Sequence, residues 1–156
     1  MNDSRIHFVE GSIFDLERSK PDAVAIFVPA GLTALRVDTE RFLAECTAIP
    51  GTVGEFKAYH TKRGTVVIVA ENRDQKLYDS GEMMEMVDQA LSIFAAAKCT
   101  NVMMNGIRLG EGPSERLMVM TINAWLQFRP EVSLKKIELV DLRGGFNKAF
   151  GGVNPN

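Results

Sequence analysis

The feature of this sequence that most constrains its fold is the apolar run at residues 22–28. The run reads DAVAIFV, in which one aspartate precedes six consecutive apolar residues. A strand that is apolar at every position offers no face to water, so it lies inside a sheet that is covered on both sides. Residues 22–28 are therefore predicted to form a central strand.

Other segments also have the residue pattern of strands. They are residues 5–9, 54–60, 65–70, 100–104 and 134–142. The first alternates polar and apolar residues, which is typical of a strand with one buried face. Lys62-Arg63-Gly64 lies between the second and the third and predicts a compact turn. These two segments are therefore expected to form a hairpin or to lie side by side.

Two segments in the first two thirds of the chain have helical spacing. Residues 38–49 place apolar residues, Cys46 among them, on one helical face. Residues 81–98 carry apolar residues at helical intervals over their whole length. Asp79 and Glu82 have the spacing of a capping box in front of this second segment. Both segments are predicted to be helices.

The alternation of strands and helices defines the expected fold class. A third helix is predicted to begin after Ser114, as its N-cap, and to end before Pro130. Strands that alternate with helices favour an α/β fold with a mostly parallel sheet covered on both faces. A chain of 156 residues falls in the range of one domain, which is predicted to span residues 1–146, with a flexible tail at 147–156.

Composition excludes several function classes. Hydrophobic residues make up 46% and charged residues 24% of the chain, which is typical of a globular protein rather than a disordered or membrane-resident one. A net charge of −2 gives no broad electrostatic reason to bind nucleic acid or an anionic membrane. Cys46 and Cys99 form neither a disulfide framework nor a metal motif. We expect a cytoplasmic protein without a metal or cofactor.

The loop at residues 105–114 is the strongest candidate for a site. Ligands of such sheets bind beyond the carboxyl ends of the strands, which indicates the loops after Val28 and after Met104. The second of these contains three glycines, which allow a backbone to approach a ligand closely or simply to turn. Arg108 could neutralise a phosphate or carboxylate. Glu111 would repel such an anion, so it is expected to face solvent, with pairing to Arg108 or a different ligand as the alternatives.

Other candidate residues are weaker. Residues 29–33 follow the central strand and are expected either to form a second wall of the site or to connect strand to helix. Ser12 is a minor candidate. His7 and His60 are expected to be ordinary strand residues, because neither lies in a motif with a nucleophile or a second base.

Several short motifs follow one another along the chain in a recognisable order. They are Gly11-Ser12-Ile13, Asp22-Ala23-Val24, Ala44-Glu45-Cys46, Gly54-Glu55, Thr61-Lys62-Arg63-Gly64 and Asn105-Gly106-Ile107-Arg108-Leu109-Gly110. From about residue 6 to residue 142 this order resembles the macro domain family. The resemblance implies a single macro-like α/β domain with a mixed, mostly parallel central sheet and helices on both faces.

The resemblance also implies a ligand. It would be ADP-ribose or another small anionic, nucleotide-derived molecule, with its diphosphate held by backbone amides of two loops and by a helix N-terminus. The residues implied to contact it are Ser12, Gly31, Thr33, Gly106, Ile107, Arg108, Leu109 and Gly110.

The sequence departs from the family pattern at three places. Ser12 replaces the acidic residue that commonly holds the adenine amino group. Pro29-Ala30 stands where the family has an asparagine for the distal ribose, and Gly31-Leu32-Thr33-Ala34-Leu35 replaces a run of glycines. Three functions therefore stay open: a ligand-binding domain, an ADP-ribosyl or phosphoester hydrolase, and a non-catalytic protein-interaction or assembly module.

Overall fold

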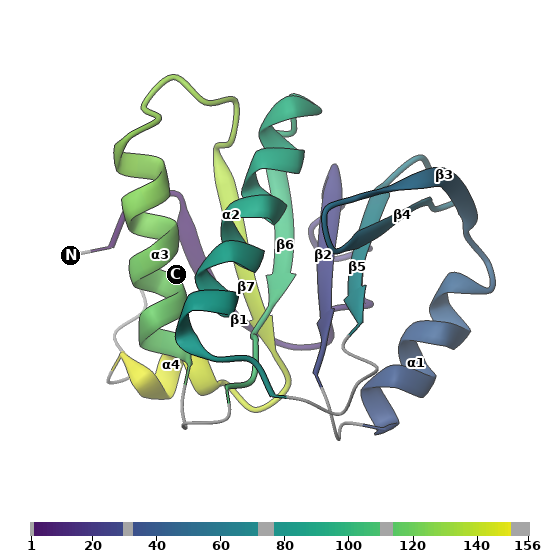
Figure 1. Cartoon of the computed structure of the whole chain (residues 1–156), viewed down its shortest axis with the longest axis horizontal. Coiled ribbons are helices and arrows are strands. Elements are labelled where there is room, and N and C mark those ends of the chain that lie inside the picture. Colours follow the sequence, from purple (N-terminus) through teal and green to yellow (C-terminus); the bar gives the residue numbers. More distant parts are fainter. Residues whose placement is uncertain (1, 30–32, 72–76, 110–113, 151–156) are drawn as a thin grey trace.

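A computed structural model describes residues 2–29, 33–71, 77–109 and 114–150. Within these residues the strands form one seven-stranded sheet in the order β1-β7-β6-β2-β5-β4-β3 (Figure 1). The strands are β1 (Ile6–Glu10), β2 (Ala23–Val28), β3 (Thr47–Val53), β4 (Phe56–His60), β5 (Val66–Glu71), β6 (Asn101–Asn105) and β7 (Lys136–Asp141). The helices are α1 (Thr33–Leu43), α2 (Ser80–Ala96), α3 (Glu115–Gln127) and α4 (Gly145–Ala149).

The sheet is mixed and mostly parallel, as predicted. Strands β1, β7, β6, β2 and β5 run parallel to one another, whereas β4, antiparallel to β5 and to β3, begins an antiparallel edge. Strand β2 is central and buried at every position, which confirms the reading of its apolar run. The predicted turn joins β4 to β5, and the amide of Thr61 donates to the carbonyl of Thr65 at 2.9 Å.

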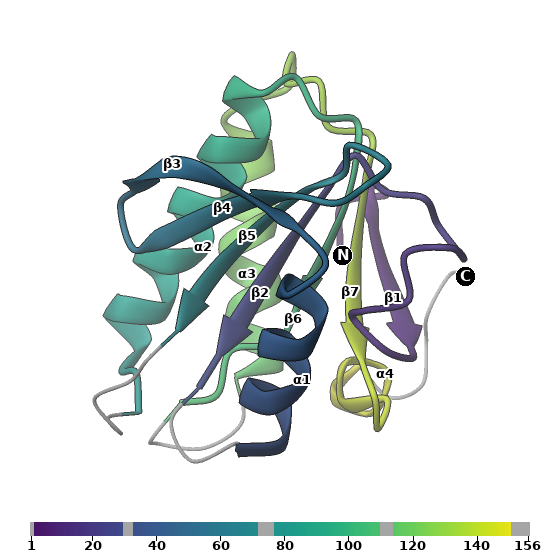
Figure 2. The same cartoon turned by 90° about the vertical axis from the view of Figure 1, so that its right-hand side faces the viewer.

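Helices cover both faces of the sheet (Figures 1 and 2). Helices α2, α3 and α4 pack against one face, over the larger part of the core. The other face is covered by α1 and by the segment between β1 and β2, through Phe42 and Leu43 of the helix and Ile13, Phe14 and Leu16 of the segment. One of the two layers that cover this sheet is therefore built largely from an irregular segment instead of helices.

The predicted helix at residues 38–49 is wrong in its position. Helix α1 ends at Leu43, and Thr47–Val53 is strand β3, paired antiparallel with β4. Strand β3 lies at the sheet edge and is mostly exposed, so its sequence lacks the apolar alternation that marks a half-buried strand. Its register shifts between Ile49 and Thr52, where Gly51 has a positive φ of 91°. Pairing with β4 decided the structure here rather than local propensity.

The helix ends agree with the sequence in part. At α2 the capping box is confirmed, since the Asp79 side chain accepts from the Glu82 amide and the Glu82 side chain accepts from the Asp79 amide. Ser114 does occupy the N-cap position of α3, but its side chain makes no capping hydrogen bond. Only its carbonyl takes part, accepting from the Met118 amide at 2.9 Å.

The C-terminal region includes a short helix. Helix α4 extends into the range that the sequence placed in a tail. Its buried Phe146 stacks on Phe8 of β1 with ring centroids 5.8 Å apart, and Phe150 stacks on the same ring at 5.0 Å. Residues 151–156 lie outside the described residues. Among the described helices, none is both long and apolar enough to span a membrane.

Candidate functional site

The carboxyl ends of β2 and β6 form a topological switch point. The two strands are parallel neighbours, paired from Ala23–Val102 to Ala25–Met104. The chain leaves β2 towards α1 on one face of the sheet and leaves β6 towards α3 on the other. Open α/β sheets bind their ligands at such a point, because the two diverging loops leave room between them. We call this part of the molecule the switch-point edge.

Asn105, the last residue of β6, fixes the spacing of the two strands at this edge. The described ladder between β2 and β6 ends at Ala25 and Met104. Beyond it, Asn105 Oδ1 accepts from the Phe27 amide at 2.7 Å, and Asn105 Nδ2 donates to the Phe27 carbonyl at 2.9 Å. Asn105 is buried, with 8% of its surface exposed. Its side chain therefore replaces backbone pairing where the strands separate.

The loop after β6 has a regular alternation of buried and exposed side chains. Ile107 and Leu109 are buried in the core, whereas Arg108 between them is exposed. Leu109 also forms a parallel bridge with Tyr78, in front of α2. Gly106 lies against the Phe146 ring, which a Cβ at this position would approach to 3.6 Å. Ile107 and Leu109 thus anchor the loop, and only their backbone groups are available to a ligand.

The remaining predicted residues lie at the same edge of the sheet or outside the described residues. Thr33 is exposed at the first position of α1, which follows β2. Ser12 follows β1, which is separated from β6 by β7, and its hydroxyl accepts from the Phe14 amide at 3.1 Å. Gly31 and Gly110, together with Glu111, fall outside the described residues.

The acidic side chains at the ends of β5 and β7 already have partners. Arg36 Nε on α1 lies 3.1 Å from Glu71 Oε1. Asp141 accepts from the Arg143 amide at 2.7 Å and from the Gly145 amide at 2.9 Å, so it holds the turn that leads into α4. Within the described part of the chain, Arg108 has no such carboxylate partner. An anion near Arg108 would meet a guanidinium that is not paired with any carboxylate among the described residues.

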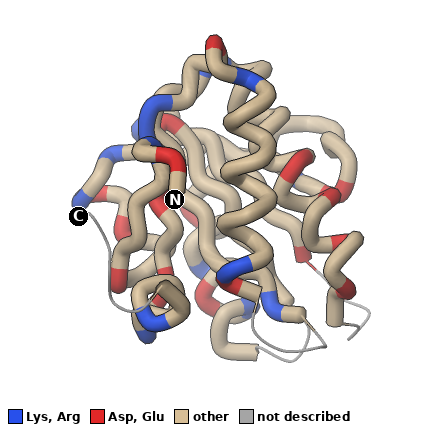
Figure 3. The backbone as a smooth tube through the Cα atoms, turned by 90° about the vertical axis from the view of Figure 1, so that its left-hand side faces the viewer, with Lys and Arg blue, Asp and Glu red and all other residues tan. Residues whose placement is uncertain are grey.

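Charge over the rest of the molecule is mixed. Figure 3 shows basic and acidic positions interspersed in the left and lower parts of the chain trace and only acidic positions in the right-hand part, so the view shows no basic face. This distribution agrees with the net charge of −2 and with a local rather than an extended anion site. Among the described residues, no group of three or more His, Cys, Asp or Glu side chains is placed to hold a metal ion.

Asn105 is the residue at this site that sequence reasoning missed. The sequence placed it only as the first residue of a glycine-containing loop. A polar amide directly after a buried apolar strand is a usable signal, since a buried amide must find both a donor and an acceptor. The partner on β2 could not be named without the strand order.

Comparison with known proteins agrees with this architecture. No family model and no curated protein matches the chain. Among solved structures, the Trypanosoma brucei macrodomain in complex with ADP-ribose has a TM-score of 0.63 at 12% identity, over 94% of this chain and 69% of that one. A macrodomain mutant from Oceanobacillus iheyensis gives 0.61 at 15% identity, over 98% and 96%. The macrodomain of Mycobacterium tuberculosis DarG gives 0.56 at 15%, over 86% and 97%.

These neighbours and the strand order define the class of the protein. The chain has the macrodomain fold, in a form whose sequence has diverged strongly from that of the solved macrodomains. At identities of 12–15% the likeness establishes the fold, and the site must be argued from this chain's own residues.

Proposed function

We propose that this protein binds a small anionic, nucleotide-derived ligand of the ADP-ribose type at the switch-point edge. The observation that carries the proposal is the loop after β6, where an exposed Arg108 lies between the buried Ile107 and Leu109 and β6 is a parallel neighbour of β2. Two structural neighbours, both the Trypanosoma brucei macrodomain, were solved in complex with ADP-ribose and with ADP. They support the same class of ligand for this chain.

The loop has the physical properties that an anion requires. Two anchored side chains and the Asn105–Phe27 hydrogen bonds reduce the freedom of the backbone, so less entropy is lost when a ligand binds. Backbone N–H groups and the N-terminus of α3 favour a negative charge. Arg108 adds a charge-assisted hydrogen bond, which is about twice as strong as a neutral one. The phosphates would therefore lie between the two loops, with Arg108 on one of them.

The test is a calorimetric titration with ADP-ribose, AMP and inorganic phosphate. The wild-type chain is expected to bind ADP-ribose saturably, and Arg108→Ala to bind it roughly tenfold more weakly. Arg41→Ala is the matched control. Arg41 is an exposed arginine on α1, and its ion pair with Asp38 is long, at 4.0 Å between Nη1 and Oδ1. Absence of saturable binding, or equal affinity of the two variants, would contradict the proposal.

We further propose that the protein works in the cytoplasm. Cys46 and Cys99 are both free thiols, and Cys99 is buried. Unpaired cysteines persist in a reducing compartment. Immunolocalisation of the tagged full chain would test this, and a secreted or envelope location would contradict it.

A further inference from the structure

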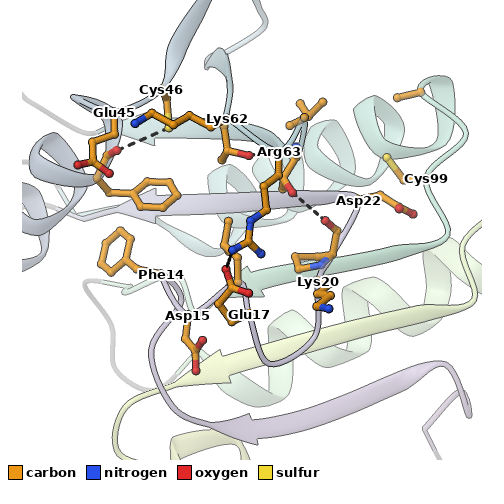
Figure 4. Close-up of a pocket in the computed structure, with 18 of the residues that line it drawn as sticks. Phe14, Asp15, Glu17, Lys20, Asp22, Glu45, Cys46, Lys62, Arg63 and Cys99 are labelled. Atoms are coloured by element: carbon orange, nitrogen blue, oxygen red, sulfur yellow. Dashed lines mark hydrogen bonds and ion pairs between the residues drawn. The ribbon is translucent and has the colours of Figure 1, made fainter.

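A groove lies at the end of the sheet opposite the switch-point edge. It has a volume of about 870 Å³ and is lined by residues from four separate segments, within 14–22, 42–46, 61–66 and 97–100 (Figure 4). These segments surround the amino ends of β2, β5 and β6, whereas the switch-point edge lies at their carboxyl ends. A volume of this size suits a small-molecule ligand. We call it the amino-edge groove.

One end of the amino-edge groove is aromatic. Phe14, from the segment after β1, and Phe42, near the end of α1, are both half-buried. Their ring centroids are 5.4 Å apart and the ring planes are tilted by 46°. Figure 4 shows Phe14 on the same side of the groove as Asp15 and Glu45. A planar ring placed here would contact aromatic carbon and bring its polar edge near carboxylates.

The other end of the groove carries basic side chains beside the carboxylates of Glu17 and Asp22. Figure 4 shows Lys20 across the groove from Phe14, with Arg63 between them. Lys98, at the turn between α2 and β6, also lines the groove. Lys20 and Lys98 are the described non-glycine residues with positive φ, at 44° and 59°. At Lys98 this conformation belongs to the end of α2, and both lysines line the groove.

The ionic partners within the groove leave the ammonium groups available. Arg63 pairs with Glu17, and both side chains are 62% exposed, so water weakens the pair and a ligand can replace either partner. Asp22 Oδ2 already accepts from the Thr100 amide, the Thr100 hydroxyl and the Asn101 amide. The described part of the chain offers Lys20 and Lys98 no ion pair.

We propose that the amino-edge groove is a second ligand site, which takes an aromatic ring joined to a phosphate, as in a nucleoside monophosphate. The ring packs against Phe14 and Phe42, where Asp15 or Glu45 accepts hydrogen bonds from its amino groups. The phosphate lies towards Lys20, and Arg63 exchanges Glu17 for a phosphate oxygen. This site is independent of the switch-point edge, since the two share no residue.

The test uses the full chain, labelled with ¹⁵N, and three probes: AMP, adenosine and inorganic phosphate. AMP is expected to shift the amide resonances of residues 61–66 and 97–100 saturably. Adenosine lacks the anion and phosphate lacks the ring, so each should bind roughly tenfold more weakly or worse. Shifts confined to residues 105–109, or no saturable shift in the groove, would overturn the proposal.

Variants separate this site from the one at the switch-point edge. Lys20→Ala and Arg63→Ala change exposed residues, and each is expected to weaken AMP binding in the groove by about tenfold. Lys135→Ala, an exposed lysine outside the groove, is the matched control, and Arg108→Ala should also leave this binding unchanged. Equal affinity of Lys20→Ala, Arg63→Ala and Lys135→Ala would show that the groove does not bind the phosphate.

Discussion

The side-chain amide of Asn105 is hydrogen-bonded to both main-chain groups of Phe27, at 2.7 Å to its N–H and 2.9 Å to its carbonyl. An asparagine can do this because its side-chain amide carries an acceptor oxygen and a donor NH2 group in the same plane. The contact holds the ends of β6 and β2 at the point where their loops diverge. It links a buried core position directly to the geometry of the proposed ligand site.

Replacing Asn105 by alanine is expected to destabilise the fold strongly. The change leaves the N–H and the carbonyl of Phe27 buried without partners, and each such group costs about 1–3 kcal/mol, so a loss of about 2–6 kcal/mol in unfolding free energy is expected. Urea denaturation followed by circular dichroism measures it. Asn123→Ala is the control, since among the described residues Asn123 bonds only Asn2 and Asp3, and it is half-buried. Equal losses for the two variants would contradict the role of Asn105.

Glu138 is expected to make stability depend on acid pH. Burial raises the pKa of its carboxyl, but hydrogen bonds from Ser19 and Arg18, with the charge of Lys136, outweigh burial and leave the pKa below its ordinary value. A lowered carboxyl pKa stabilises the fold above the pKa of the unfolded chain, and this contribution is lost as the pH falls through the folded value. The pH range in which Glu138 makes stability depend on pH therefore lies below about pH 5.

The corresponding variant is Glu138→Gln. It is expected to lose about 1–3 kcal/mol of unfolding free energy at neutral pH, because the charge-assisted bond to Arg18 is weakened. The difference in unfolding free energy between the variant and the wild type should become smaller as the pH is lowered towards about 3. Urea denaturation at a series of pH values measures this, with the exposed Glu131→Gln as control. A difference that is constant with pH would exclude Glu138 as the titrating group.

Lys98 occupies a position that favours glycine. At the end of α2 the Cys99 amide donates to the Phe94 carbonyl and the Lys98 amide to the Ala95 carbonyl, both at 3.0 Å, which is a Schellman motif with Lys98 at its left-handed position. Lys98→Gly is expected to raise stability by about 0.5–1 kcal/mol, whereas Lys98→Ala keeps the strain and should bring no gain. Thermal denaturation checks both. If the amino-edge groove binds AMP, the glycine variant should be more stable and bind AMP more weakly.

The two thiols are expected to react slowly. Burial raises the pKa of Cys46, with a smaller contribution from Glu45, and burial likewise raises the pKa of Cys99, with a smaller contribution from Asp22. Less thiolate is then present at neutral pH than in a free cysteine, and the thiolate is the reactive form. Alkylation by iodoacetamide should be slower than that of glutathione at both positions, and the urea-unfolded chain provides the control. Fast alkylation of Cys46 would indicate an activated thiol and favour a catalytic function.

Part of this fold follows from local sequence. The apolar run of β2 and the capping box of α2 are local patterns with one physical solution, and both were predicted correctly. Strand β3 was missed because it is an exposed edge strand, whose conformation comes from pairing with β4 rather than from its own residues. Ser114 is the N-cap of α3 as predicted, although its side chain makes no capping hydrogen bond.

The candidate sites likewise follow in part from the sequence and in part from the tertiary structure. The sequence by itself determined the class of fold, a central buried strand and a glycine-containing loop carrying Arg108, because these depend on periodicity and composition over a few neighbouring residues. Only the tertiary structure decided that Asn105 pairs with Phe27 and that four distant segments surround one groove. Both depend on the order of the strands, and strand order is set by the packing of the whole chain, which no short stretch of sequence contains.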